Sequence, residues 1–523
     1  VLFLDNIQNM DASSLDFLSL LIRSRNKNLF ILGTCPVNWE DRLKKSLSVL
    51  VKEKQITKIF VQVVALVGFS RILQPGEYGI MAMAAVISNF AIIFRDLGTG
   101  SAIIQKKKID DGFLSSLFWM NMIVGGGIMI IIMIISPLVA VFFHESQLTY
   151  VLILLSISFP LASLGIIHQS YLERNNKFSQ VCFVEMISAI FALGIGIATA
   201  LLGGGVYSLV IMTVIQTLIS SVGFWFVSNW TPSFSFDKKD INDVLNFSGN
   251  LTLFNLVNYF SRNSDNMIIG HYFSTSILGA YSLAYRIMLF PLQSLTSVAS
   301  RSLYPVISRM KNNNEGNVTD LYLRTLSFIS IFTLPLMAGL WLLSDSFVSV
   351  VFGEKWILVS SILFWLAPTG FIQSLVSTTG TIYMAYGKVG LLFKLGVFSS
   401  FLQIFAFIVG AQYNVIVLAK LYFISNLINF FVAMYFTLKL LSGNLMQLLI
   451  KLLPTIFCTI VMLFVVAVIK CVLKHYNYND ITLLISGVCS GSIIYLLLFI
   501  VFFRKMLIND LPSALSNKIT RMR

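Results

Sequence analysis

The chain has 523 residues, of which 57% are apolar and only 11% are charged, and its mean hydropathy is +0.83. A soluble domain averages about 25% charged residues, so this composition excludes an ordinary soluble enzyme and is typical of a polytopic membrane protein. The formal net charge of +14 is what basic cytoplasmic loops give such a protein, and the five cysteines lack the spacing of a metal site.

The first 45 residues differ in character from the rest. The apolar run VLFLD ends in Asp5, and a second apolar run, NLFILGT, occupies residues 28–34. An order of strand, helix and strand around such an acid resembles the Walker B region of a signalling P-loop ATPase. The phosphate-cradling sequence GxxxxGK followed by Ser or Thr occurs nowhere in the chain, so this segment is expected not to hydrolyse ATP alone. We interpret residues 1–50 as a non-functional N-terminal fragment that lies outside the apolar main part of the chain.

Fourteen mostly apolar segments follow, each long enough for the roughly 20 residues that a helix needs to cross a bilayer. The sequence therefore predicts an all-α protein with about 14 transmembrane helices. The expected spans are 56–73, 78–95, 114–136, 148–168, 180–201, 205–227, 247–269, 277–299, 325–351, 357–377, 389–410, 414–437, 449–472 and 481–503.

Basic residues are distributed unevenly over the loops between these spans. One set of loops, together with both chain ends, carries most of them, including Lys106 to Lys108 and the pair Lys238 and Lys239. Because Lys and Arg are enriched on the cytoplasmic side, we predict that both termini are cytoplasmic, as an even number of spans requires. The segment 228–246 is then a cytoplasmic linker, and residues 504–523 form a basic cytoplasmic tail.

The two halves of the membrane region resemble each other in sequence. The matches are weak individually, but they occur in the same order along the chain, and one of them pairs Gly79 with Gly279. The aligned segments are 77–90 (EYGIMAMAAVISNF) with 277–290 (ILGAYSLAYRIMLF), 136–145 (SPLVAVFFHE) with 345–354 (DSFVSVVFGE), and, more loosely, 205–210 with 414–419.

This repetition predicts two six-helix lobes related as parallel repeats about an axis normal to the membrane. We expect an N-lobe at 56–227 and a C-lobe at 247–437, with two further helices at 449–503. Two related lobes around a central cleft are the plan of a transporter, which favours transport over a receptor or scaffold role.

Several motifs occur in a fixed order: SRILQPGEYGIMAMA (70–84), FRDLGTGSAIIQ (94–105), YLERNNKF (171–178), SRNSDNMIIG (261–270) and FGEKW (352–356). Over about residues 56–510 the chain resembles polysaccharide-exporter flippases of the multidrug/oligosaccharidyl-lipid/polysaccharide superfamily, especially the colanic acid exporter branch. The resemblance implies a V-shaped transporter that works by alternating access. It also implies a substrate, an undecaprenyl-pyrophosphate-linked oligosaccharide, moved from the cytoplasmic to the outer leaflet of the bacterial inner membrane for exopolysaccharide, capsule or O-antigen biosynthesis.

Charged residues inside the predicted spans are the candidate site. Arg262 and Asp265 share a helix face because they are three residues apart, and Arg286 lies at similar depth in the next span. Charges at membrane depth are costly, so each should face the cleft or a partner. We expect the two arginines to bind the pyrophosphate, since a guanidinium stays charged and forms a bidentate fork, and Asp265 to orient one of them. Asn258 and Tyr285 are candidates for contact with the glycan, and packing against neighbouring helices is the alternative role of the tyrosine.

A structural ion pair between Arg262 and Asp265 is the alternative interpretation, and the two are compatible. Other charges are weaker candidates for a gate or for ion coupling: Arg71, Arg95, Asp96, Glu185 and Lys394. Topology anchoring is the competing explanation for the first three. The sequence does not decide between proton, sodium and membrane-potential drive.

Three other functions compete with a flippase. An ATP-driven regulator built on residues 1–45 is opposed by the missing phosphate-cradling sequence. A cation-coupled drug antiporter of the same superfamily would favour an acidic or aromatic cavity, whereas this chain offers arginines. A membrane glycan ligase or polymerase usually carries a large external loop, and no predicted external loop here exceeds about twenty residues. We therefore expect a transporter rather than an enzyme, without cofactor, metal or nucleic acid. Its expected partners are membrane lipids, the lipid-linked oligosaccharide, a polysaccharide polymerase and export machinery.

Overall fold

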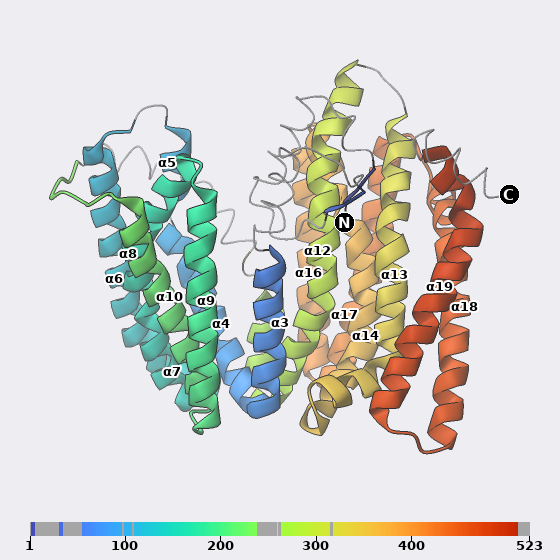
Figure 1. Cartoon of the computed structure of the whole chain (residues 1–523), viewed down its shortest axis with the longest axis horizontal. Helices are drawn as coiled ribbons and strands as arrows, with labels where there is room; N and C mark the ends of the chain where they lie inside the picture. Colours follow the sequence, from blue (N-terminus) through green and yellow to red (C-terminus); the bar gives the residue numbers. More distant parts are fainter. Residues whose placement is uncertain are drawn as a thin grey trace. The chain divides into compact units, whose positions relative to one another are not determined.

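The computed structural model describes residues 2–5, 31–34, 55–96, 99–106, 109–237, 259, 263–313 and 317–510. Apart from two short strands, the described chain is helical (Figure 1). The helices are α3 (Gln55–Ile72), α4 (Pro75–Asp96), α5 (Thr99–Gln105), α6 (Asp111–Phe142), α7 (Gln147–Ser156), α8 (Ser158–Arg174), α9 (Phe178–Leu201), α10 (Val206–Ser228), α12 (Thr275–Asn313), α13 (Val318–Val351), η2 (Glu354–Trp356), α14 (Ile357–Val376), α15 (Thr379–Ala385), α16 (Val389–Ala411), α17 (Val415–Leu440), α18 (Leu445–His475) and α19 (Asp480–Asp510).

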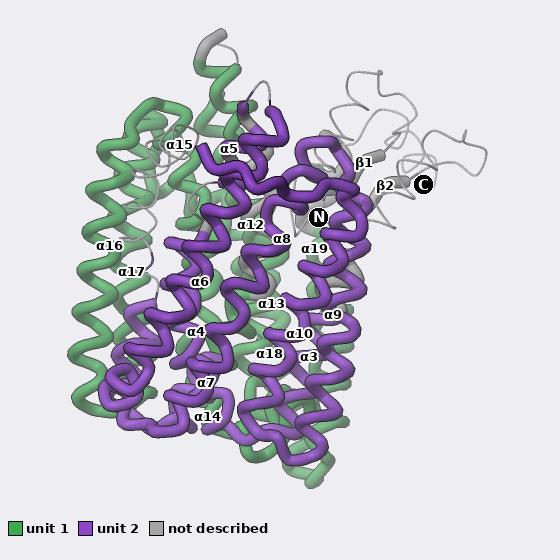
Figure 2. Tube along the Cα trace, turned by 90° about the vertical axis from the view of Figure 1, so that its left-hand side faces the viewer, with its two compact units in different colours: residues 1–44, 283–523 green, residues 45–282 purple. Residues whose placement is uncertain are grey.

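The chain divides into two compact units (Figure 2). Unit 2 comprises Lys45–Ser282 and contains α3 to α10 and the first turns of α12. Unit 1 comprises Val1–Lys44 and Leu283–Arg523, with the rest of α12 and α13 to α19. Helix α12 therefore runs from one unit into the other.

The two strands lie in the N-terminal segment. β1 (Leu2–Asp5) and β2 (Ile31–Thr34) pair in parallel, with Leu2 opposite Ile31 and Asp5 opposite Thr34. Parallel pairing needs a crossover connection of a dozen or more residues, which residues 6–30 provide. The strands fall where the sequence predicted them, while the helix expected between them lies outside the described residues.

Among the described residues, 11 helical stretches are long and apolar enough to cross a membrane, and a shorter apolar helix covers Val61–Ile72. The chain is thus an all-α, multi-span membrane protein, as its composition predicted. The number of fourteen spans stays a prediction, since most of the expected span 247–269 lies outside the described residues. The expected span 148–168 is two consecutive helices, α7 and α8, which meet at Ile157.

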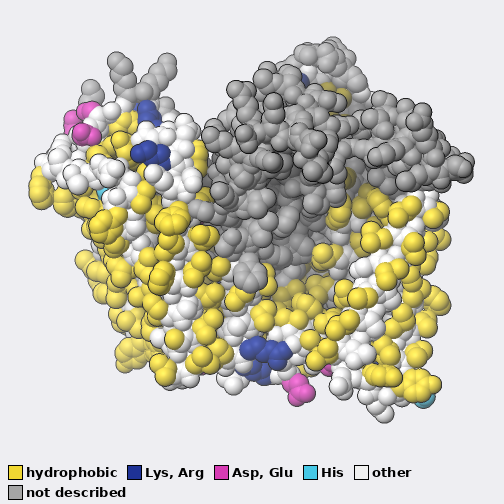
Figure 3. All heavy atoms as spheres, in the orientation of Figure 1, with side chains coloured by type: hydrophobic (Ala, Val, Ile, Leu, Met, Phe, Trp, Pro, Cys, Tyr) yellow, Lys and Arg dark blue, Asp and Glu magenta, His cyan; other side chains and the backbone are white. Residues whose placement is uncertain are grey.

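Large apolar side chains are exposed on the outer helix faces, where they would meet lipid. Leu138 and Val141 on α6, Phe226 on α10 and Val501 on α19 are each at least 70% exposed. In Figure 3 hydrophobic side chains cover the flanks formed by α6 to α10 and by α18 and α19, whereas charged side chains appear near the helix ends. This distribution is what a bilayer selects, because each charge at its centre is costly.

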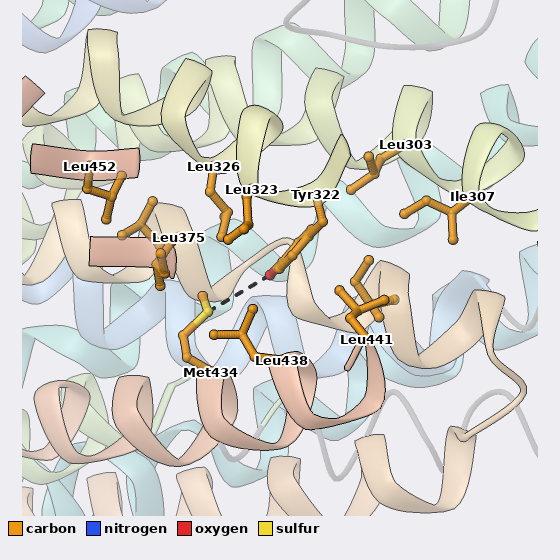
Figure 4. Packing of buried hydrophobic residues seen from close by; sticks show 12 residues of the cluster. Leu303, Ile307, Tyr322, Leu323, Leu326, Leu375, Met434, Leu438, Leu441 and Leu452 are labelled. Atoms are coloured by element: carbon orange, nitrogen blue, oxygen red, sulfur yellow. Dashed lines mark hydrogen bonds between the residues drawn. The ribbon is translucent and has the colours of Figure 1, made fainter. Parts of the chain in front are cut away.

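The interior of unit 1 is held by a hydrophobic cluster with residues from six helices (Figure 4). Tyr322 of α13 is fully buried in it, and its hydroxyl lies 3.2 Å from Oγ1 of Thr378 and 4.0 Å from Sδ of Met434. A buried phenol needs such partners, since an unpaired hydroxyl in an apolar core costs several kcal/mol. Leucines and isoleucines of α12, α13, α14, α17 and α18 surround it: Leu303, Ile307, Leu323, Leu326, Leu375, Leu438, Leu448 and Leu452.

Helix starts in unit 1 follow ordinary capping chemistry. Asn414 precedes α17 and its side-chain oxygen accepts the N–H of Val417 at 2.8 Å. Asn444 and Gln447 form a reciprocal capping box before α18. Each cap satisfies backbone donors that the first helical turn leaves unpaired, so the sequence itself marks where these helices begin.

Candidate functional site

The starts of α4 and α12 cross within unit 2 at van der Waals contact of their backbones. A methyl group on Gly79 would lie 1.8 Å from the carbonyl oxygen of Thr275. A methyl group on Gly279 would lie 1.9 Å from the carbonyl oxygen of Pro75. Only glycine permits so close an approach of two helices, so both positions are fixed by the packing.

This crossing joins the residues that the internal repeat aligned. Thr275 and Gly279 lie 200 positions after Pro75 and Gly79, which is the offset of the first aligned segments. Gly79 therefore contacts Thr275, the residue that corresponds to Pro75, and Gly279 contacts Pro75, the residue that corresponds to Thr275. The contact is therefore reciprocal, as two repeats related by a local two-fold axis would make it.

The helical residues 263–272 end at a turn, and α12 folds back along them. The Asp265 carboxylate is buried and 3% exposed. Its Oδ2 accepts the hydroxyl proton of Tyr281 at 3.2 Å, and its Oδ1 accepts the N–H of Asn266 at 2.7 Å. At the next residue of each helix, Ser282 Oγ donates to Asn266 Oδ1 at 3.2 Å. The carboxylate is thus held by donors from both arms of a helical hairpin.

Tyr259 closes the hairpin against α4. Its hydroxyl donates to the backbone carbonyl of Val86, and its ring lies 5.7 Å from that of Phe90. Asn263 Nδ2 donates to the Tyr259 carbonyl at 3.0 Å. Tyr259 thus links the residues before Asp265 to α4 by a hydrogen bond, and the glycine crossing joins the other arm of the hairpin, α12, to the same helix.

The predicted cavity residues differ in how exposed they are and in whether the structure describes them. Arg262 and Asn258 lie outside the described residues. Asp265 is buried, and its role in orienting an arginine stays a prediction. Tyr285 is half-buried and Arg286 is exposed, and both stand on the part of α12 that belongs to unit 1. The predicted grouping of Asp265 with the two arginines stays a prediction.

The predicted gate and coupling residues lie at helix ends and on exposed faces. Arg71 is exposed in the last turn of α3, and Arg95 is half-buried in the last turn of α4, where Asp96 is the final residue. Glu185 on α9 is half-buried, whereas Lys394 on α16 is exposed. Their proposed roles in gating or coupling remain predictions.

Two features of unit 2 escaped the sequence analysis. Gln169 Nε2 donates to Glu173 Oε1 at 2.8 Å and lies 3.5 Å from Glu185 Oε1, so one amide on α8 bridges two carboxylates. Glu173 is buried, but the predicted span ended at residue 168 and left it in a loop, whereas α8 continues to Arg174.

Tyr281, the partner of Asp265, was the second omission. Residues 265 and 281 are equally far along the sequence from residue 273, and residues 266 and 282 are equally far from residue 274. Residues 273 and 274 form the turn between the two helices. A helical hairpin folded there brings these positions together, so the turn was the available signal. Among the described residues there is no group of three or more His, Cys, Asp or Glu side chains suited to a metal ion.

A family of proteins described as polysaccharide biosynthesis proteins matches residues 69–361, more than half of the chain. The chain belongs to this family. The matched region contains the glycine crossing and the hairpin that holds Asp265, so both features are set within the family's own part of the sequence.

Curated relatives agree with this family over most of their length. The chain is 26% identical over 416 residues to the teichuronic acid biosynthesis protein TuaB of Bacillus subtilis, covering 79% of this chain and 86% of TuaB. It is 26% identical to the succinoglycan biosynthesis transport protein ExoT of Rhizobium meliloti, covering 86% and 91% of the two chains. It is also 26% identical to the lipopolysaccharide biosynthesis protein WzxC of Escherichia coli, covering 66% and 70%.

Solved structures show the same fold. The lipid II flippase MurJ in an inward closed conformation superposes with a TM-score of 0.71 at 18% identity, covering 89% of this chain and all of MurJ. An inward-facing multidrug resistance transporter of the MATE family superposes with a TM-score of 0.55 at 15% identity, covering 73% and 94%. At such identities the likeness concerns the fold alone.

Proposed function

We propose that the protein is a flippase that moves lipid-linked oligosaccharides across the membrane for polysaccharide biosynthesis. The family match over residues 69–361 is the observation that carries this proposal. It is supported by relatives named for the biosynthesis of teichuronic acid and for succinoglycan transport, each covered over more than four fifths of its length. The proposed substrate is an undecaprenyl-pyrophosphate-linked repeat unit, carried from the cytoplasmic to the outer leaflet of a bacterial inner membrane, with both chain termini in the cytoplasm.

The proposed binding site for the pyrophosphate consists of Arg262 and Arg286, with Asp265 as the orienting carboxylate. Arg286 is exposed on α12 rather than packed into the core, so its guanidinium is available to an anion. Asp265 is anchored by Tyr281 and by the backbone of Asn266, and an anchored carboxylate can hold a guanidinium in one orientation. Asn258 and Tyr285 are proposed to contact the glycan.

Alternating access gives the glycine crossing a role in this proposal. The backbones of α4 and α12 touch at the glycine crossing. We propose that this contact closes one end of the region around the helical hairpin. Under the predicted topology this is the outer end, since α4 begins at Pro75 and ends at Arg95–Asp96 toward the Lys106 loop. Release of substrate to the outer leaflet would then require the two helix starts to separate.

Arg71, Arg95 and Asp96 are proposed to line the mouths of this pathway, and Glu185 and Lys394 to take part in coupling. A drug antiporter has no specific observation in its favour, because the likeness to the MATE transporter is one of fold. A polysaccharide polymerase and export proteins are the proposed partners, since a flipped repeat unit must be joined to others before it reaches the cell surface.

The test is deletion of the gene in its native host, followed by complementation. Loss of the flippase should abolish a surface polysaccharide and leave polyprenyl-linked repeat units accumulating on the cytoplasmic side, where an impermeant glycan-oxidising reagent cannot reach them in intact cells. Restored surface glycan on complementation supports the proposal. Unchanged surface glycan together with raised drug sensitivity would instead identify a drug transporter.

A further inference from the structure

Two histidine side chains lie close together in unit 2, beside the C-terminal end of α6, which is the end of that helix farther from Lys106. His144 lies in the turn between α6 and α7, and His271 is the penultimate residue of the helical stretch 263–272. Their ring centroids are 5.4 Å apart, and the ring planes are tilted by 43°. Neither is part of the site proposed above.

The separation of the two rings suits a shared metal ion. Zinc binds a histidine nitrogen at about 2 Å, and that nitrogen lies about 1 Å from its ring centre. Two imidazoles at a tetrahedral angle on one ion therefore place their ring centres about 5 Å apart. The observed separation of the ring centres, 5.4 Å, is close to that value.

The hydrogen bond of His271 is the one that orients a metal ligand. Its Nδ1 lies 2.8 Å from the carbonyl oxygen of Phe142, so Nδ1–H donates to the backbone, and the ring stacks on Phe142 at 4.6 Å. Metal-ligating histidines commonly donate one ring N–H to a backbone carbonyl, which fixes the tautomer and leaves the other nitrogen for the metal. Here that other nitrogen is Nε2.

The backbone of His144 indicates that its side chain is retained for a reason. Its φ is +55°, in the left-handed region that favours glycine. The repeat alignment pairs His144 with Gly353, whose φ is +99°. The second half of the chain thus has glycine at the corresponding turn, whereas the first half keeps a histidine at a conformational cost of roughly 1 kcal/mol. Strain of this kind concentrates at functional positions.

We propose that His144 and His271 form a binding site for a divalent transition metal ion such as Zn²⁺, with water completing its coordination shell. The site would join the α6–α7 turn to the helical residues 263–272, which carry Asp265. The two elements already touch, because a methyl group on Gly270 would lie 2.8 Å from the Phe143 ring. A bound ion would hold this contact closed and so, resting on the proposed function, slow export.

The site is tested with the purified full-length chain in detergent, carrying an affinity tag without histidines and treated with EDTA. Calorimetric titration with ZnCl₂ should show one ion per chain, and zinc should raise the melting temperature. His144→Ala or His271→Ala should weaken binding at least about tenfold, since even the loss of a partner that orients a metal ligand costs 10- to 100-fold. His475→Ala is the matched control, because His475 is exposed at the end of α18.

His144→Gly separates binding from folding. Glycine relieves the positive φ, so this variant should melt at the same temperature as the wild type or higher without metal, and should lose the zinc response. Zinc binding that is equal in wild type, His144→Gly and His271→Ala overturns the site. So does the absence of any binding below millimolar zinc.

A transport measurement tests the clamp independently. External zinc should slow export by the wild type and leave His144→Gly unaffected. Zinc that binds the wild type without changing its export overturns the clamp. A chain that binds zinc but exports nothing in its absence counts against the proposed flippase function, while the metal site stands.

Discussion

The hydroxyl of Tyr281 lies 3.2 Å from Oδ2 of Asp265, and both side chains are buried in unit 2. An ionised carboxylate in such a place is stable only if its lone pairs are occupied. Tyr281 and the N–H of Asn266 supply two donors, so Asp265 has partners in the hairpin that do not depend on Arg262. The hairpin fold and the carboxylate therefore support each other.

Replacing Tyr281 by Phe should destabilise the protein by about 1.5–3 kcal/mol, the usual worth of a hydrogen bond to a charged group. The ring stays in place, so the loss concerns the hydroxyl alone. Thermal unfolding in detergent measures it, with Tyr272→Phe as the control, because the Tyr272 side chain is 59% exposed. Equal melting temperatures for the two variants would show that Asp265 does not need this donor.

Alanine at Gly79 or Gly279 should disrupt the crossing of α4 with α12. The added methyl group would meet a backbone carbonyl oxygen, which cannot rotate away, so the cost should exceed the 1–3 kcal/mol typical of overpacking. We expect low yields of folded protein or, if it folds, lost export. Gly126→Ala is the matched control, since it lies within α6 with open space around it and should be neutral or stabilising by up to about 1 kcal/mol. Full export by Gly79→Ala would contradict a tight crossing.

Arg286→Ala should leave a folded, inserted protein that does not export glycan, because the pyrophosphate loses a charge partner. Arg286→Lys should restore export only in part, since an ammonium keeps the charge but loses the bidentate fork. Arg309→Ala, an exposed arginine on the same helix, is the control. Surface polysaccharide and melting temperature are measured together for each variant. Normal export by Arg262→Ala and Arg286→Ala, singly and combined, would refute the proposed cation site.

The topology can be checked by cysteine labelling in a cysteine-free background. Position 107 should be inaccessible to an impermeant maleimide in intact cells, and position 146, in the turn after α6, should react. The expectation follows from the excess of Lys and Arg on one side of the spans. The reverse labelling pattern would invert the protein in the membrane and place the His144 and His271 pair inside the cell.

The helices could be predicted because a membrane span is a long apolar run in the sequence. The residues at which the helices end could not be predicted in this way. Helix α12 extends to Asn313, well past the predicted 277–299, because hydropathy marks where a helix leaves the bilayer rather than where its hydrogen bonds stop. The division of 148–168 into α7 and α8 had a signal in Pro160, whose missing N–H interrupts the helix one turn earlier.

For the site, the sequence identified Asp265 as a buried charge but not its partners. A helix face can be read from spacing within one segment, whereas Tyr281 is brought to Asp265 by the turn at 273–274, whose geometry follows from packing against α4. The repeat alignment of Gly79 with Gly279 indicated a contact between two helices, which neither position indicates alone. It paired two residues whose reciprocal contact depends on both helices at once.

The reciprocal glycine crossing also limits which substitutions the two helix starts can accept. In most interfaces a larger side chain on one side can be accommodated by a smaller one opposite, so the two halves can drift together. Here the opposing atoms are the carbonyl oxygens of Pro75 and Thr275, which every amino acid carries. No substitution at one helix start can compensate for the loss of the glycine at the other, so the backbone itself fixes the residue type at both positions.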